Sequence, residues 1–252
     1  ANMVGCAFSF KKDTGYYVPV HYTISDSSWP VECTIDTFKE VFTDIFEDGK
    51  IQKVCQNGKY DISILRNYDI NVNGFHFDTM IASYILDPDQ KHNMDELSQR
   101  ELNYVPIPLS SLIGEKKDPT KIYAVEIDRI ANYSAEDADV TYQLYEVLSK
   151  KIKANKQEKL AYEIEFPLVN CLEEMERTGI RVDTKTLKQQ SKELGKIIEE
   201  ETAAIHEIAG QIFNVGSPTQ LQKILFDNLK LPPTKKIKTG YSTDAQSLES
   251  LR

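Results

Sequence analysis

The stretch KVCQNGKYDISILRNY, residues 53–68, carries a short β-strand pattern that runs directly into a helical one. In the predicted helix, one face is formed by residues at helical spacing: Asp61, Ile64, Leu65 and Tyr68. An aspartate on an otherwise apolar face is unusual, because an ionised carboxylate is costly to bury unless it is paired or binds a metal. This stretch therefore predicts an α/β unit in which Asp61 points toward the core.

Strand and helix patterns alternate on both sides of this stretch. Residues 3–10 and 16–22 have strand patterns joined by the turn KKDTG, and residues 31–48 are helical in pattern. Residues 75–87, FHFDTMIASYILD, repeat the step from strand to helix, with Asp78 as the expected helix cap. This order predicts a sheet covered by helices.

The character of the chain changes near residue 156. A helical pattern over 134–152 closes the α/β region, and long helical patterns without strand signals follow it. One of these has Ser217 as its N-cap and a proline at the first helical position. We therefore predict two domains, residues 1–155 and 156–252.

The composition is that of a globular protein. Hydrophobic residues make up 40% of the chain and charged residues 27%, and no apolar run approaches the ~20 residues needed to cross a bilayer. The four cysteines form no CxxC pair, and the first residues have no signal-peptide pattern. We expect a cytoplasmic monomer that contacts no membrane.

The charge balance limits how the chain can bind nucleic acid. With 30 Lys and Arg against 39 Asp and Glu, the net charge is −9, whereas non-specific DNA affinity comes from cations that neutralise phosphates. The dense basic stretch is KLPPTKKIK, residues 230–238. Any DNA contact is therefore expected to be local, with a solvated loop as the alternative for this stretch.

Asp137 is a second carboxylate on an apolar face. The corresponding face of the predicted helix contains Asp137, Val140, Thr141, Leu144 and Leu148. An acid in the first turn of a helix is also favoured by the helix macrodipole, so a capping role is the alternative to metal binding. Two inward-facing carboxylates can share a divalent cation, and oxygen-only ligation suits Mg²⁺ or Mn²⁺ rather than zinc.

Segments along nearly the whole chain resemble the family A DNA polymerases. QNGKYD (56–61) and YSAEDADVT (133–141) resemble the second and third exonuclease motifs of that family, and FDTMIASYIL lies between them as expected. Residues 163–183 resemble the helix that leads into the polymerase domain, while residues 213–231 and 238–251 resemble its thumb.

The resemblance implies a ribonuclease H-like mixed sheet with flanking helices, in which two metal ions held by four carboxylates cleave the 3′-terminal nucleotide. It assigns Asp61 and Asp137 as metal ligands and Tyr133 as the residue that positions the attacking water. It also implies a set of DNA-binding residues: Gln56, Asn57 and Tyr60 around the terminal nucleotide, Leu109 as an apolar wedge, and Lys235, Lys236, Lys238 and Ser242 in the thumb.

The chain departs from the family at the first exonuclease motif, an Asp-x-Glu on the first, central strand. None of its aspartates is followed by glutamate two positions later. We therefore expect the remaining carboxylates to lie before Ala1 and the isolated chain to be inactive. We likewise expect no nucleotide transfer, because the family's palm and fingers would follow Arg252.

Three functions follow from these observations. The first is a part of a family A polymerase that synthesises DNA in replication and repair and proofreads by 3′–5′ exonuclease hydrolysis. The second is a catalytically silent DNA-binding module. The third is a stand-alone ribonuclease of the same nuclease superfamily, against which the thumb-like segment beyond residue 156 argues.

Overall fold

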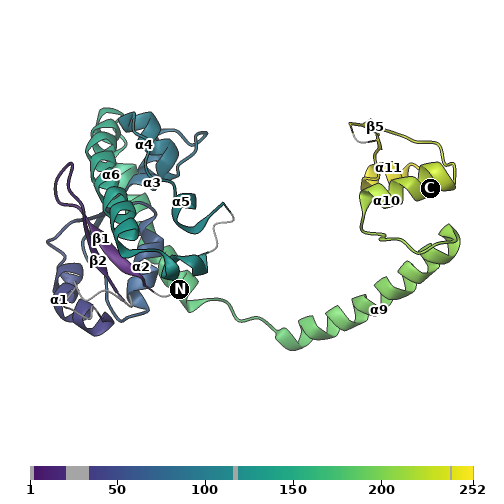
Figure 1. The fold of residues 1–252 in the computed structure, drawn as a ribbon, viewed down its shortest axis with the longest axis horizontal. Helices are drawn as coiled ribbons and strands as arrows, with labels where there is room; N and C mark the ends of the chain where they lie inside the picture. The colour runs from purple at the N-terminus through teal and green to yellow at the C-terminus, as the bar shows by residue number, and fades with distance from the viewer. Residues whose placement is uncertain (1–2, 21–33, 116–118, 239, 252) are drawn as a thin grey trace. The chain divides into compact units, whose positions relative to one another are not determined.

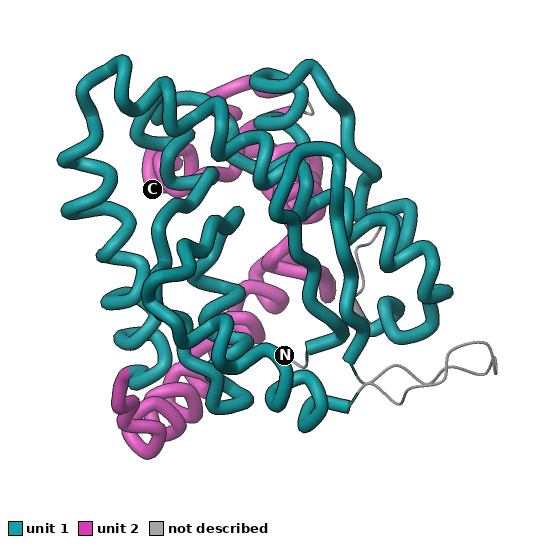
Figure 2. The backbone as a smooth tube through the Cα atoms, turned by 90° about the vertical axis from the view of Figure 1, so that its left-hand side faces the viewer, with its two compact units in different colours: residues 1–179 teal, residues 180–252 magenta. Residues whose placement is uncertain are grey.

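The computed structural model describes residues 3–20, 34–115, 119–238 and 240–251. The chain divides into two compact units, Ala1–Gly179 and Ile180–Arg252, which are coloured separately in Figure 2. No helix within the described ranges is long and apolar enough to span a membrane.

The first unit contains two pairs of strands. β1 (Gly5–Phe8) pairs antiparallel with β2 (Tyr16–Pro19), and β3 (Lys53–Cys55) pairs parallel with β4 (Phe75–Asp78). The predicted strand pair and the predicted step from strand to helix at Asp78 are both confirmed. The described strands do not form the single sheet that we predicted, because no ladder joins β1 or β2 to β3 or β4.

Three helices of this unit, α1, α3 and α4, begin where the sequence provides a cap. Thr34, Asp78 and Asn93 each accept a hydrogen bond from a backbone N–H in the first turn of the helix that follows. The predicted capping role of Asp78 is therefore confirmed. Figure 1 labels α1 to α6 of this unit. The bounds of its α-helices are α1 Ile35–Glu47, α2 Gly58–Arg66, α3 Thr79–Leu86, α4 Met94–Leu102, α5 Ser110–Ile113, α6 Ile127–Ala154, α7 Glu158–Leu160 and α8 Phe166–Thr178.

α6 begins seven residues earlier than the predicted helix that started at Ser134. Its N-cap, Glu126, makes no side-chain capping bond, so the sequence carries no clear start signal there. Asp137 consequently lies three turns inside the helix, beyond the first turn where the macrodipole acts on side chains. The alternative of a capping role for Asp137 is wrong.

The hydrophobic core of the first unit consists of two clusters. One includes Phe77 and Leu144 with Val54 of β3 packed against it. The other includes Phe38, with Phe8 of β1 packed against it. α6 contacts β1, β2 and β3, so a single helix lies against both strand pairs.

Residues 156–179, which we grouped with the thumb-like segment, pack on the first unit in this structure. α8 contacts α2 and β4. The buried Glu173 of α8 lies 2.7 Å from the guanidinium of Arg66 on α2, and the exposed Glu174 also pairs with Arg66. The proposed boundary at residue 155 thus falls within one compact unit.

The second unit is mainly helical. Its long helix α9 (Thr184–Ala209) has no buried residue, and Ser217 caps α10 (Pro218–Gln222) as predicted. The remaining elements are the π-helix η3 (Lys223–Asn228), the hairpin of β5 (Lys236–Ile237) and β6 (Gly240–Tyr241), and the short helix α11 (Ala245–Glu249). Ile224 and Phe226 are buried among them.

Candidate active site

Asp61 lies in the first turn of α2, and the start of that helix is fixed from β4. Asn57 adopts a left-handed conformation with φ 62°, and the Asp78 carboxylate accepts hydrogen bonds from Asn57 N at 3.2 Å and Gly58 N at 2.7 Å. A Cβ on Gly58 would lie 2.6 Å from the Phe75 ring, so glycine allows α2 to start against the strands.

A cavity of about 750 Å³ contains both predicted metal ligands among its lining residues. It is bordered by β1, β3, α2 and α6, and α2 contributes Asp61 while α6 contributes Asp137. The structure therefore places these two carboxylates, 76 positions apart in the numbering, on one cavity.

Asp61 is solvent-exposed through this cavity and is not packed in the core as we predicted. Protein atoms nevertheless surround it, and the resulting loss of hydration, together with the negative charge of Asp78, raises the pKa of Asp61 to about 7. Water in the cavity reduces this penalty relative to full burial.

Asp137 is half-buried on α6. Burial is the main factor that raises its pKa to about 7, and the charges of Glu136 and Asp95 act in the same direction. The hydroxyl of Tyr133 donates a hydrogen bond to the Asp137 carboxylate, which lowers the pKa and opposes burial. Burial and the adjacent carboxylate raise the pKa of Tyr133 itself, so its hydroxyl stays protonated.

The side chains on the cavity supply part of the oxygen ligand set that a hard divalent cation needs. No Lys or Arg in the described ranges forms an ion pair with Asp61 or Asp137, so both carboxylates are free to bind a cation. Within those ranges, no three His, Cys, Asp or Glu residues are grouped as a metal site. The cavity thus presents two carboxylates, the ligand type that suits Mg²⁺ or Mn²⁺.

Gln56 and Tyr60 also line the cavity, but only one of these two side chains is free to contact a ligand. The Gln56 amide donates to the His92 carbonyl at 3.0 Å and accepts from the Thr79 hydroxyl. Tyr60 is 58% exposed, and the Asn57 side chain is also exposed. Gln56 is therefore held by the protein, whereas Tyr60 and Asn57 are free to contact a ligand.

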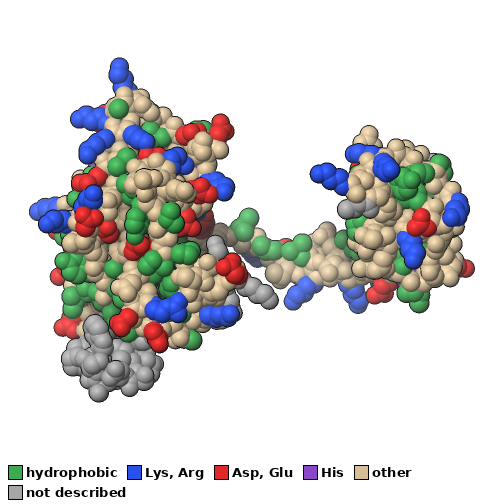
Figure 3. Space-filling view, turned by 45° about the horizontal axis from the view of Figure 1, so that its top comes forward, with side chains coloured by type: hydrophobic (Ala, Val, Ile, Leu, Met, Phe, Trp, Pro, Cys, Tyr) green, Lys and Arg blue, Asp and Glu red, His purple; other side chains and the backbone are tan. Residues whose placement is uncertain are grey.

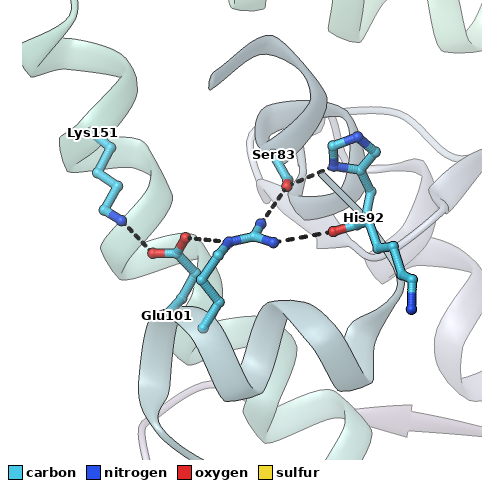
Figure 4. A network of polar contacts seen from close by, with 6 residues as sticks. Ser83, His92, Glu101 and Lys151 are labelled. Carbon is cyan, nitrogen blue, oxygen red and sulfur yellow. Dashed lines mark hydrogen bonds and ion pairs between the residues drawn. The ribbon is translucent and has the colours of Figure 1, made fainter. Parts of the chain in front are cut away.

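The loop that holds His92 is braced by a polar network (Figure 4). His92 Nδ1 lies 2.8 Å from the Ser83 hydroxyl, which also accepts from Arg100 at 3.0 Å. Glu101 pairs with Arg100 and with Lys151 of α6. This network fixes the carbonyl that orients Gln56.

Leu109 does not line the cavity. It lies half-buried at the start of α5. The segment before it is more exposed, with Val105 at 74%. Glu136 holds this segment, because its carboxylate accepts from the Tyr104 hydroxyl and from Ile107 N, the latter at 2.7 Å. Sequence reasoning missed Glu136, since its partners lie about 30 residues away and no local pattern signals them.

The predicted thumb residues lie on the β5–β6 hairpin of the second unit. Lys235, Lys236 and Lys238 are exposed, and Lys235 lies 3.7 Å from the Asp244 carboxylate. Ser242 is buried, and its hydroxyl accepts from Asp244 N at 3.2 Å, so it caps a turn within the protein. On the face shown in Figure 3, basic side chains are scattered over both units and form no single patch.

Comparisons with known proteins agree with the order of these units. Residues 1–153 match the sequence family described as 3′–5′ exonuclease, and residues 184–252 match DNA polymerase family A. A solved structure, the POL domain of Pol1 from M. smegmatis in complex with DNA primer-template and dNTP, is similar with a TM-score of 0.69 and 26% identity. The similarity covers 94% of this chain and 36% of that one.

Curated relatives are bacterial DNA polymerase I proteins. That of Pseudomonas aeruginosa is 35% identical over 252 residues, covering 98% of this chain and 27% of the relative. That of Borreliella burgdorferi is 36% identical over 252 residues, covering 100% of this chain and 27% of the relative. The chain thus spans about a quarter of the length of these relatives. The chain therefore belongs to the DNA polymerase I family, with a 3′–5′ exonuclease region over residues 1–153 and a family A polymerase region over residues 184–252.

Proposed function

We propose that the first unit is the 3′–5′ exonuclease part of a DNA-synthesising and proofreading polymerase, and that Asp61 and Asp137 hold a divalent cation, Mg²⁺ or Mn²⁺, in the cavity between them. The observation that carries the proposal is the location of two carboxylates without basic partners on one cavity. A ribonuclease H-like sheet is the fold we propose for this unit.

Each residue has a separate part in the proposed reaction. When bound, a divalent cation lowers the pKa of coordinated water and neutralises charge on a phosphodiester. Asp61 and Asp137 supply anionic oxygens, and their raised pKa values make cation binding weaker below pH 7. Tyr133 orients the Asp137 carboxylate by hydrogen bonding, and in this proposal its hydroxyl positions the attacking water. The exposed ring of Tyr60 offers a face on which a terminal base can stack.

We propose that the second unit contacts duplex DNA through Lys236 and Lys238 of the hairpin, with Lys235 in a weaker role because Asp244 already pairs with it. These contacts are to phosphates and carry no sequence preference. Ser242 supports the hairpin from inside and does not reach phosphate in this proposal.

The test is release of the 3′-terminal nucleotide from single-stranded DNA with Mg²⁺ or Mn²⁺. In a protein that contains these residues together with the Asp-x-Glu strand of the family, Asp61→Asn and Asp137→Asn should each reduce release at least ~100-fold. Asp89→Asn, on an exposed loop, is the matched control and should have no effect. Full activity in the Asp137→Asn variant would overturn the assignment.

A second candidate, a catalytically silent DNA-binding module, is favoured for the 252-residue chain by itself. Its described residues group no three metal-binding side chains, so we expect no nucleotide release by the chain alone. If the chain alone degraded single-stranded DNA and Asp137→Asn abolished this, the silent module would be excluded and the nuclease proposal would stand.

A further inference from the structure

The turn between β1 and β2, residues 10–16, presents aromatic side chains to solvent and is called the aromatic turn below. Phe10 is 72% exposed and Tyr16 is 57% exposed, and their ring centroids lie 6.0 Å apart. Phe10 also stacks on Phe8, with a centroid distance of 6.4 Å and an angle of 5° between the ring planes. Large apolar side chains that gather at one exposed place, rather than singly, are typical of a surface that binds a ligand.

The exposed rings are held in place from the core. Phe8 stacks on Phe42 of α1 with a centroid distance of 5.2 Å, and Phe42 stacks on Phe38 at 4.8 Å. Phe38 is buried, so a row of rings runs from the core to the solvent at Phe10. Because this row is anchored, its outer ring loses little side-chain freedom when a ligand stacks on it.

Two lysines lie beside the exposed rings. Lys11 and Lys12 are both exposed, and neither forms an ion pair with another described residue. The Lys11 carbonyl accepts hydrogen bonds from the hydroxyls of Ser9 and Thr14, which hold the backbone of the turn. In a chain with a net charge of −9, two adjacent unpaired cations suit the turn to an anionic ligand, although Asp13 follows them.

The aromatic turn lies next to the part of α6 that carries Asp137. A Cβ added to Gly15 would lie 2.2 Å from the carbonyl oxygen of Ala135, so a glycine is needed for the turn to approach α6 this closely. Ala135 is two positions before Asp137. Within the aromatic turn, Phe10 borders the cavity that contains Asp137, whereas the other side chains do not line it. The turn is therefore a surface beside the proposed metal site and distinct from it.

We propose that the aromatic turn is a binding site for single-stranded DNA, in which bases stack on Phe10 and Tyr16 and the two lysines contact phosphates. Aromatic side chains combined with cations bind single strands without sequence preference, because every base has a face that can stack. A duplex does not fit this site, since its base faces are stacked on one another. The choice of DNA rests on the proposed nuclease function: the strand is the one whose 3′ end reaches the proposed metal site.

The main test measures binding of a fluorescein-labelled oligothymidylate of about 12 nucleotides, within the usual site size of single-strand binders, to the 252-residue chain by fluorescence anisotropy. EDTA is present, so that the result does not depend on the proposed metal site. Phe10→Ala should weaken binding at least ~5-fold through the loss of one base–aromatic stack, whereas Phe10→Trp should keep the affinity within ~2-fold because it retains a ring. Tyr123→Ala, which removes another exposed ring of the first unit, is the matched control and should leave the affinity unchanged.

The lysines are tested through the salt dependence of the same binding. Each phosphate contact to a single strand adds about 0.7 to the slope of log affinity against log salt, so the double variant Lys11→Ala, Lys12→Ala should flatten the slope by roughly 1.4. The double variant Lys150→Ala, Lys153→Ala makes the same charge change at the exposed end of α6 and should keep the original slope. An unchanged slope in the first variant, or equal slopes in both, would overturn the proposal.

The remaining outcomes exclude the alternative roles of the rings. If Phe10→Ala binds DNA like the unchanged chain, the exposed rings only extend the core and the proposal fails. If Phe10→Ala and Phe10→Trp lose affinity equally, the phenylalanine supports the fold of the turn rather than a stacked base, and the proposal fails. If the chain self-associates by light scattering and Phe10→Ala abolishes this, the rings form a protein interface and the proposal also fails.

Photocrosslinking locates the bound strand independently of any variant. An oligothymidylate with a central 5-iododeoxyuridine should crosslink, on irradiation, to Phe10 or Tyr16, as mapped by mass spectrometry. Crosslinks confined to residues 180–252 would overturn the proposal. Failure of this site is distinguishable from failure of the nuclease proposal, because binding in EDTA does not depend on nucleotide release: undiminished release by Asp137→Asn would remove the nuclease assignment and leave the effects of Phe10→Ala unchanged.

Discussion

The Asp78 carboxylate accepts a hydrogen bond from the Gly58 backbone N–H at 2.7 Å, which joins the end of β4 to the start of α2. The same carboxylate accepts from Asn57 N, and it caps α3 by accepting from Met80 N at 2.9 Å and Ile81 N at 3.2 Å. One buried side chain thus satisfies the first turn of α3 and also holds the start of the helix that carries Asp61.

Replacing Asp78 should therefore cost more than the loss of an ordinary helix cap. We expect Asp78→Ala to lower the free energy of unfolding by about 3 kcal/mol, because four backbone donors lose their acceptor in a buried site. The Asn93 side chain caps α4 by accepting one backbone N–H at 3.0 Å. Asn93→Ala removes this cap and should lower the free energy of unfolding by about 1 kcal/mol. Urea unfolding measures both, and equal losses would show that the link to α2 adds nothing.

Asp137 should make stability fall as pH rises. Its pKa is raised from 3.8 to about 7 in the folded protein, so between these values the native state binds more protons than the unfolded state, and the free energy of unfolding decreases with increasing pH. Asp137→Asn should remove this contribution, leaving stability equal near pH 4 and higher by roughly 1–2 kcal/mol at pH 8, a value reduced because the side chain is half-buried.

The measurement is urea unfolding from pH 4 to pH 8, with Asp89→Asn as the control that keeps the wild-type slope. Part of the fall in the free energy of unfolding with pH should remain in the Asp137→Asn variant, because the pKa of Asp61 is also raised to about 7. A variant with an unchanged slope would show that Asp137 is hydrated in the native state like an ordinary surface carboxylate.

The ion pair of Arg66 and Glu173 joins α2 to α8 in a buried site. Nη1 lies 2.7 Å from Oε2, yet neither Glu173 oxygen has an aligned hydrogen bond. Removing one partner leaves a buried charge, so Arg66→Met should cost about 3–5 kcal/mol. The double variant Arg66→Met, Glu173→Leu should recover most of this loss, because an apolar pair needs no desolvated charges.

A double-mutant cycle by urea unfolding measures this coupling. Glu174→Gln, which also contacts Arg66 but is exposed, is the control and should change stability by less than ~1 kcal/mol. Additive losses in the double variant would mean that Glu173 is stabilised by groups other than Arg66.

The sequence predicted what local spacing determines and missed what distant contacts determine. Asp61 and Asp137 were identified because a carboxylate interrupts an apolar face, which depends on neighbours three and four residues away. The start of α6 was missed because its N-cap, Glu126, makes no side-chain capping bond and so gives no signal. The role of Glu136 depends on Tyr104 and Ile107.

Ser242 illustrates a second limit of sequence reasoning. A hydroxyl beside lysines and glycine has the composition of a phosphate-binding loop, but pairing of Ser242 N with the Lys235 carbonyl at 2.9 Å turns that side chain inward. Hairpin pairing decides which side chains face solvent. The neighbouring Lys236 and Lys238 remain exposed.

The exposed lysines of the hairpin should dominate the salt dependence of duplex-DNA binding. Each phosphate that they neutralise adds about 0.9 to the slope of log affinity against log salt, so the double variant Lys236→Ala, Lys238→Ala should flatten the slope by roughly 2 without changing sequence preference. Lys235 is left in place because its removal would also free Asp244.

The control, Lys150→Ala with Lys153→Ala at the exposed end of α6, makes the same charge change in the other unit. Anisotropy titrations with a short duplex at several salt concentrations distinguish the two pairs. Equal slopes for both variants would mean that the hairpin contributes only its net charge, and an unaltered slope would mean that it does not contact DNA.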